Sequence, residues 1–146
     1  MSARWIALVI LLGAALGCSQ GLEGRYLGES KGTITVATVP EQRSNLSGSN
    51  ITLVVSGAGK GNVAIAFGDC KLKATGATDV KATVESGQKC KVRVPDGATE
   101  EVTVGQGLLE RDGGNLTLRV NGTFTRANAD GTTAPGTYEL TYTGKR

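Results

Sequence analysis

Apolar and polar residues alternate along most of the chain after residue 24. A period of two is typical of β-strands that pack one face against a core and leave the other face in solvent. No window after residue 20 shows apolar residues at helical spacing over three turns. We therefore expect about eight to ten strands. Their apolar positions lie within 34–36, 51–55, 63–67, 70–74, 80–84, 90–94, 102–104, 116–120 and 138–142.

Glycine-containing segments between these strands predict short turns. Glycine, and asparagine or aspartate beside it, adopts positive φ angles at low steric cost. Such turns favour antiparallel neighbours, because parallel strands need crossovers of a dozen or more residues. Two longer polar segments, Pro40–Asn50 and Ala127–Gly136, are expected to be loops and are the candidate functional loops. The predicted turns are Gly57–Asn62, Asp96–Gly97, Asp112–Gly114 and Asn121–Gly122.

Antiparallel strands with one buried face can close into a small up-and-down barrel or fold into a two-sheet sandwich. We expect an all-β fold and favour the lipocalin-like barrel over the sandwich. The length fits one domain with a continuous core. The 22 glycines are scattered between apolar segments, which indicates turns and bulges and not a collagen-like or linker sequence.

The first residues have the pattern of an export signal. Met1–Arg4 carries one positive charge, and the apolar segment Trp5–Leu16 is too short to span a bilayer as a helix. We expect residues 1–17 to be cleaved, residues 18–23 to form a short tether, and residues 24–146 to form a single β domain.

Ala15-Leu16-Gly17-Cys18 resembles the lipobox of bacterial lipoprotein precursors, in which a small residue precedes a cysteine that is acylated. The resemblance implies that Cys18 becomes the first residue of the mature chain and anchors it in a membrane through its lipid. Ser19, where aspartate would favour inner-membrane retention, implies the outer membrane. The alternative is a plain secretory signal that ends in the small residues before Cys18.

The mature domain shows a second resemblance at its two ends. Gly24-Arg25-Tyr26 at the first strand and Lys145-Arg146 after the last are similar to the lipocalin arrangement, in which a glycine and a tryptophan pack near an arginine from the final strand. Tyrosine stands here in the place of that tryptophan. The resemblance implies a barrel with room for a small apolar ligand.

Cys70 and Cys90 form an even pair that would be exported to an oxidising compartment, which favours a disulfide. It would close a loop of about twenty residues and stabilise the fold by roughly 3 kcal/mol. A flat three-stranded meander would hold the outer strands about 10 Å apart, whereas a disulfide needs α-carbons within about 7 Å. Either the intervening segment bulges away or the cysteines lie on facing sheets, and both arrangements point them inward.

If these cysteines point inward, their alternating neighbours point outward and form a basic face. Its five expected members are Lys71, Lys73, Lys89, Lys91 and Arg93. Like charges held close together repel, which favours an anion-binding surface for an acidic glycan, lipid head groups or an acidic protein. The alternative is that the lysines protect sheet edges against aggregation.

Several classes of chemistry have little support in this composition. Histidine is absent, which removes the usual general base and the common metal ligand. Glu100 and Glu101 would point to opposite faces of a strand and cannot form a carboxylate pair. The segments 112–115 and 127–132 lack the ligand spacing of a calcium loop. We expect no enzymatic activity, metal or cofactor.

Two hypotheses for function remain. The first is a non-catalytic, membrane-anchored envelope lipoprotein that binds a macromolecule or an anionic envelope component through its outer face or the Pro40–Asn50 loop. The second is a lipocalin-like carrier of a small apolar ligand or lipid. The net charge of +3 is too small for a nucleic-acid binder, and we expect a monomeric domain.

Overall fold

The computed structural model describes residues 21–93, 99–127 and 130–146 and shows an antiparallel β-barrel. The expected all-β class is confirmed, and the described residues contain no helix. The nine strands are β1 (Gly24–Val36), β2 (Gln42–Gly59), β3 (Asn62–Phe67), β4 (Cys70–Thr75), β5 (Lys81–Val84), β6 (Lys89–Arg93), β7 (Thr99–Asp112), β8 (Asn115–Ala127) and β9 (Thr133–Lys145).

The sheet closes because β5 pairs with β7 as well as with β4. The strands follow the order β5-β4-β3-β2-β1-β9-β8-β7, and the β5–β7 ladder joins the two ends of this series. β6 also pairs with β7, further along the same strand. Every ladder is antiparallel, so the structure is a barrel and not a two-sheet sandwich.

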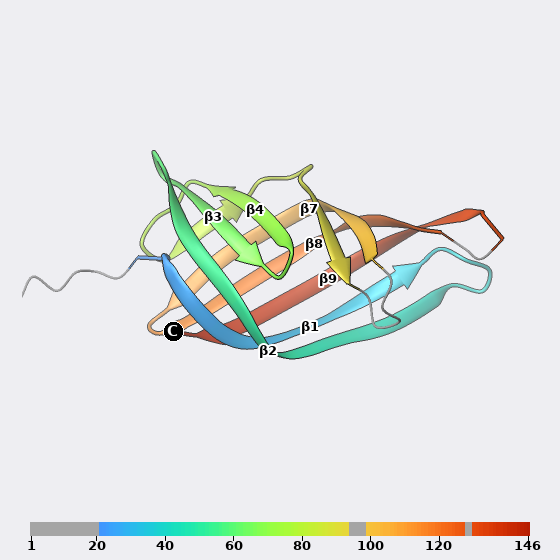
Figure 1. The fold of residues 1–146 in the computed structure, drawn as a ribbon, viewed down its shortest axis with the longest axis horizontal. Coiled ribbons are helices and arrows are strands. Elements are labelled where there is room, and N and C mark those ends of the chain that lie inside the picture. The colour runs from blue at the N-terminus through green and yellow to red at the C-terminus, as the bar shows by residue number, and fades with distance from the viewer. Residues whose placement is uncertain (1–20, 94–98, 128–129) are drawn as a thin grey trace, which may run out of the picture.

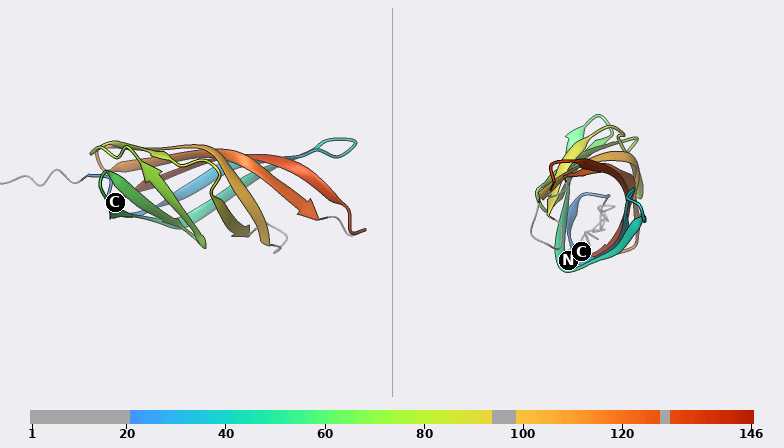
Figure 2. Two further views of the ribbon diagram at one scale, coloured as in Figure 1. Left: turned by 90° about the horizontal axis from the view of Figure 1, so that it is seen from above. Right: turned by 90° about the vertical axis from the view of Figure 1, so that its right-hand side faces the viewer.

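The barrel is closed over only part of its length. β1, β2, β7, β8 and β9 have 13 to 18 residues, whereas β3, β4, β5 and β6 have 4 to 6. The long strands therefore continue beyond the short ones (Figure 1). We call the continuation formed by residues 30–36, 42–50, 121–127 and 133–141 the extension. The view down the long axis shows the strands encircling the interior (Figure 2).

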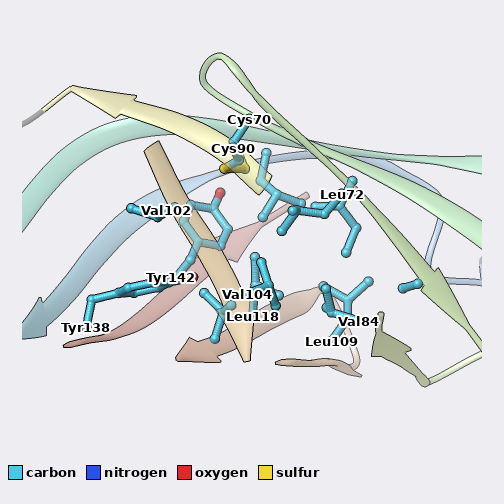
Figure 3. Close-up of a cluster of buried hydrophobic side chains, with 14 of the residues drawn as sticks. Cys70, Leu72, Val84, Cys90, Val102, Val104, Leu109, Leu118, Tyr138 and Tyr142 are labelled. Carbon is cyan, nitrogen blue, oxygen red and sulfur yellow. A yellow bond between two sulfur atoms is a disulfide. The ribbon is translucent and has the colours of Figure 1, made fainter. Parts of the chain in front are cut away.

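The interior of the closed part is filled with aliphatic and aromatic side chains (Figure 3). They come from all sides of the barrel, because alternate residues of each strand point inward. The largest side chains with less than 2% exposure include Tyr26, Leu53, Ile65, Leu109 and Tyr142. The Tyr142 hydroxyl lies 3.0 Å from the carbonyl oxygen of Tyr26 and 3.1 Å from that of Ile51. A buried hydroxyl thus has hydrogen-bond acceptors within the core.

The inner face of the extension has a different design, in which aromatic rings lie over glycines of the neighbouring strand. Gly122 is opposite Tyr138, and Phe124 is opposite Gly136. A methyl group on Gly136 would come within 2.4 Å of the Phe124 ring. The prediction of a turn at Asn121–Gly122 was therefore wrong. Glycine is needed there because an aromatic side chain from the next strand occupies the space above it.

The other predicted turns have mixed outcomes. Gly59, Lys60 and Gly61 have positive φ angles and connect β2 to β3, and Gly113 does the same between β7 and β8. These two turns are confirmed. The predicted turn at Asp96–Gly97 lies outside the described residues.

The first long polar segment is mainly strand, contrary to the sequence-based expectation. Gln42–Asn50 is the first half of β2, and its residues Gln42–Gly48 pair with β1 from Val36 back to Ser30. The second segment is divided, because Asp130–Thr132 lies in the expected loop between β8 and β9 whereas Thr133–Gly136 begins β9 and pairs with β8. Both segments are mostly polar because one side of the extension is in solvent and the other faces only a thin core. Alternation of apolar residues is therefore weak, although the backbone is extended.

The opposite end of the barrel is closed by the two ends of the described chain. Leu22 and Tyr26 are buried there, and the Tyr26 hydroxyl donates a hydrogen bond to the Leu22 carbonyl at 2.9 Å. The Arg146 guanidinium lies 5.3 Å from the centre of the Tyr26 ring and donates to the carbonyls of Gly21 and Glu23. We call this end the base. In the ranges that the structure describes, no helix has the length and apolar character needed to cross a membrane.

Candidate functional site: the lysine face over the disulfide

The candidate site lies where the barrel closes between β4 and β6, and the Cys70–Cys90 disulfide holds these strands together. The two α-carbons are 5.0 Å apart. Both cysteines point inward, above Leu72, Val102 and Tyr142 in the core (Figure 3). The disulfide predicted from sequence is confirmed.

β4 and β6 approach each other because β5 and β6 do not lie side by side. Both pair with β7, one after the other along its length. Lys81–Val84 pairs with Gly107–Glu110, and Lys89–Arg93 pairs with Thr99–Thr103. β4 pairs with β5 at only two positions, and the disulfide joins the start of β4 to β6. Of the two arrangements considered from sequence, the first is closer to the structure. The intervening segment leaves the space next to β4, although it does so by joining the β7 ladder.

The Gln88 side chain bridges the gap between β4 and β6. Its carboxamide oxygen accepts from the Lys73 backbone amide at 2.7 Å, and its carboxamide nitrogen donates to the Lys73 carbonyl at 2.9 Å. The same nitrogen donates to the Glu85 carbonyl at 2.8 Å. The Glu85 backbone amide also donates to the Lys73 carbonyl, at 3.0 Å. The Gln88 side chain thus extends the backbone pairing of β4 past the end of β5 and supplies an acceptor for the Lys73 amide.

Four exposed lysines lie on the outer side of these joined strands. Cys70, Leu72 and Cys90 are buried, so the alternating residues of β4 and β6 point to solvent. We call this surface the lysine face, and its members are Lys71, Lys73, Lys89 and Lys91. The outward orientation predicted for these four residues agrees with their exposure. The Arg93 backbone pairs with Thr99 in β6, but its side chain lies outside the described structure, as does Cys18.

The lysine face is only partly neutralised. Lys89 Nζ lies 3.2 Å from Glu101 Oε1, and both side chains are more than half exposed. Exposed ion pairs of this kind contribute about 0 to 1 kcal/mol. Among the described residues, no carboxylate lies within 4 Å of the ammonium groups of Lys71, Lys73 or Lys91. Three of the four charges are therefore available to a ligand.

Comparison with known protein families, with curated proteins and with solved structures gives no match for this chain.

The contact between Tyr26 and Arg146 is the geometry on which the resemblance to lipocalins was based. A methyl group on Gly24 would lie 2.6 Å from Arg146 Nε, so the glycine makes room for the guanidinium. This contact describes how the base of this barrel is closed. Membership of the lipocalin family stays a prediction.

The surface formed by the described residues includes open hollows, of which two are of a size to consider for a ligand. One, of about 720 Å³, is at the base beside Leu22, Lys60 and Asp79. The other, of about 800 Å³, lies along β5, β7, β8 and β9 near Gln106 and Arg119. Large ligand cavities in eight-stranded barrels lie inside the ring, whereas side chains fill the interior here at the level of the disulfide (Figure 3). The carrier hypothesis stays a prediction without support from these hollows.

The two consecutive glutamates of β7 have separate partners on opposite faces. Glu101 pairs with Lys89 on the outside, whereas Glu100 Oε1 accepts from Arg126 Nε at 2.7 Å toward the inside. The Glu100 side chain is 10% exposed, and its second oxygen is buried without a hydrogen-bond partner. Sequence reasoning missed this ion pair, because 26 residues separate its members and only the β7–β8 register brings them together.

The aspartate of the segment 127–132 has a local role. Asp130 Oδ1 accepts from the backbone amide of Thr132 at 2.9 Å and from its hydroxyl at 2.6 Å. The Thr132 hydroxyl and amide lower the pKa of Asp130 below its usual value. This is the behaviour of an aspartate that stabilises a turn. Across the described ranges, no group of three or more histidine, cysteine, aspartate or glutamate residues could hold a metal ion.

Proposed function

We propose that this protein is a non-catalytic, membrane-anchored envelope lipoprotein that binds an anionic envelope component through the lysine face. The observation that carries the proposal is the group of four exposed lysines on two covalently joined strands. Among the described residues, only Lys89 of these four lysines has a carboxylate partner. The chemistry recognised would be clustered phosphate or carboxylate groups, such as those of lipid head groups or an acidic glycan.

The rigidity of the lysine face supports binding. The disulfide and the Gln88 bridge fix β4 relative to β6, so the four lysine α-carbons are held in place without a ligand. A surface organised in advance loses less conformational entropy on binding than one that must be ordered. The repulsion between the four lysines is therefore part of the free energy of folding and is not added on binding.

Protection of a sheet edge accounts for only part of the lysine face. Among the described residues β6 pairs with β7 alone, and its part beyond Cys90 has an open edge, where Lys91 discourages pairing with another chain. Lys71 and Lys73 are on β4, opposite Ala66 and Ala64 of β3. Gln88 and the disulfide join the other side of β4 to the start of β6, so Lys71, Lys73 and Lys89 have no open edge to protect.

The proposed anchor fits the position of the base. Cys18 is three residues before Gly21, whose carbonyl is bound by Arg146 at the base. A lipid on Cys18 would therefore hold the base toward the membrane and leave the extension to project away from it (Figure 1). Cys18→Ser should abolish incorporation of labelled fatty acid in the producing cells. Continued labelling would reject acylation at this position.

Binding can be tested with the mature chain from Ser19 to Arg146, secreted behind a general export signal that is removed, so that neither its own lipid nor its leader contributes. We expect it to co-sediment with vesicles that contain anionic phospholipid and to bind them less as salt is raised, because the attraction is screened. K71Q/K73Q/K89Q/K91Q should lose most of this binding. K31Q/K60Q/K81Q/K145Q removes the same charge from exposed lysines elsewhere and should retain it.

A soluble acidic polysaccharide distinguishes the two sources of anionic groups. If the polysaccharide inhibits vesicle binding, both ligands bind the lysine face. The ligand that binds more tightly then identifies whether lipid head groups or a glycan supply the anionic groups. Equal loss of binding in the two quadruple variants would mean that net charge alone is responsible. That result, or unchanged binding in K71Q/K73Q/K89Q/K91Q, would overturn the proposal.

A further inference from the structure

The first half of β2 is an exposed sheet edge along the extension. β1 pairs with this half from Ser30 to Val36, whereas β3 pairs with β2 only from Leu53 to Gly59. Alternate residues between Gln42 and Asn50 therefore direct backbone N–H and C=O groups to solvent. β2 forms the lower border of the extension in Figure 1. Such an edge is a template for another strand.

We propose that this edge of β2, residues Gln42–Asn50, pairs with the same edge of a second copy to form an antiparallel dimer. The dimer differs from the monomer expected from sequence, and it does not depend on the lysine face. In a two-fold pairing of identical strands, each residue must be compatible with the residue that it faces in the second copy.

The charges along β2 permit this pairing. Arg43 is the only charged residue from Gln42 to Asn50. Antiparallel pairing centred on Leu46 places Asn45 opposite Ser47 of the second copy, and Arg43 falls beside the bulge that Ser49 and Asn50 form. No like charges meet across the interface, and polar side chains face each other on the outer side.

The inner side of the same pairing joins apolar surfaces. Leu46 lies opposite Gly32 of β1 and packs against the core while staying partly exposed. At the two-fold axis it would meet Leu46 of the second copy. The dimer would thus continue both the hydrogen-bond ladder and the apolar inner face of the extension.

The edge of β6 shows what an edge closed to pairing looks like in this protein. It carries Lys89 and Lys91, and antiparallel pairing of β6 with itself about Lys91 would place lysine against lysine. It is also held to β4 by the disulfide. The β2 edge has neither kind of protection. This difference favours a second copy on β2, because the one charge of this edge, Arg43, does not face itself in the two-fold pairing.

The test transfers the lysine pattern of β6 to β2. In analytical ultracentrifugation of the secreted mature chain from Ser19 to Arg146, we expect a concentration-dependent dimer. N45K/S47K places lysines opposite each other twice in the proposed register and should weaken dimerisation roughly tenfold or more. T137K/T143K adds the same charge at exposed positions of β9, which has neighbours on both sides, and should leave the dimer unchanged.

Hydrogen exchange locates the interface. Amides of residues 42–50 should become protected as the protein concentration rises, and this gain should be lost in N45K/S47K. The far-ultraviolet spectrum and an intact Cys70–Cys90 disulfide would show that the variant folds. A wild-type chain that stays monomeric throughout the micromolar range, or a dimer that N45K/S47K leaves intact, would overturn self-pairing. Protection of these amides only in unfractionated envelope material would also overturn it, because another protein would then supply the strand.

Discussion

The closed barrel and the extension are built from the same long strands but stabilised in different ways. In the barrel the eight strands of the ring, β1 to β5 and β7 to β9, each have hydrogen-bonded neighbours on both sides, and side chains such as Leu53, Ile65 and Leu109 have no exposed surface. In the extension, β2 has a neighbour on one side only among the described residues. Its inner face depends on the two aromatic–glycine pairs, Tyr138 with Gly122 and Phe124 with Gly136.

The barrel therefore provides stability, whereas the extension provides backbone groups that are available for pairing. Closure buries apolar surface from every direction and leaves few backbone groups unpaired, so the barrel supplies most of the free energy of folding. The extension retains an unpaired edge and needs only enough burial to keep its strands extended. We expect substitutions to be costly in the barrel and tolerated in the extension.

The largest contrast should come from two leucine truncations. Leu118→Ala in the barrel, where the side chain is 1% exposed, should lower the free energy of unfolding by roughly 3 to 4 kcal/mol. Leu46→Ala at the edge of the extension should cost less than about 1 kcal/mol, because the leucine is partly exposed already. Urea denaturation measures both values. Similar costs would show that the two regions fold with equal contributions.

Removal of the disulfide should have the next largest effect. Cys70→Ser/Cys90→Ser is expected to lower the free energy of unfolding by about 3 kcal/mol, because the unfolded chain gains conformational freedom. Hydrogen exchange should become faster mainly in β4, β5 and β6. Amides of the β1–β9 ladder in the extension are the internal reference, and an equal increase there would mean that closure supports the whole sheet.

Loss of a single hydroxyl distinguishes two of the buried tyrosines, Tyr142 and Tyr138, on a smaller scale. Tyr142→Phe removes the donor to the carbonyls of Tyr26 and Ile51 in the barrel and should cost about 1 to 2 kcal/mol. The Tyr138 hydroxyl lies 3.4 Å from the Thr103 carbonyl, which is long for a hydrogen bond. Tyr138→Phe should therefore cost less than about 0.5 kcal/mol. Thermal unfolding at neutral pH provides the comparison, and the reverse order would contradict it.

The smallest expected effect is on the pH dependence of stability. Burial raises the pKa of Tyr138 from its usual value of 10.0 to about 12. The folded protein therefore keeps this hydroxyl neutral at a pH where the unfolded chain ionises it, and stability should fall as the pH rises from about 10 to about 12. Tyr138→Phe should make this decline shallower, as measured by denaturant midpoints across that range. An identical slope in the variant would assign the decline to other groups, of which Tyr142 is one because burial also raises its pKa.

The fold of the barrel could be predicted because its strands alternate cleanly. Cys70, Leu72 and Ala74 point inward as expected, and the intervening lysines point outward. Gln42–Asn50 was missed because its inward positions are mostly polar or glycine and carry no apolar signal of period two. Asn121–Gly122 was misread because a glycine that accommodates a ring has the same sequence signature as a glycine in a turn.

The candidate site likewise has features that the sequence predicts and features that it does not. The disulfide and the outward lysines follow from redox environment and strand periodicity, which are local properties of the sequence. The Gln88 bridge and the Glu100–Arg126 pair depend on which strands meet, and that is fixed by the register of the closed sheet. No spacing within the sequence encodes those contacts.

The closure of the base by Arg146 has a consequence for protein engineering. β1 and β9 are neighbours in the sheet, and the last side chain binds the carbonyls of Gly21 and Glu23, so the strand order is cyclic in space. A short linker could join the two ends, and new termini could be opened at the exposed Val39, in the connection between β1 and β2. The resulting circular permutant would keep every ladder of the barrel and place its new termini at the end of the molecule opposite the base.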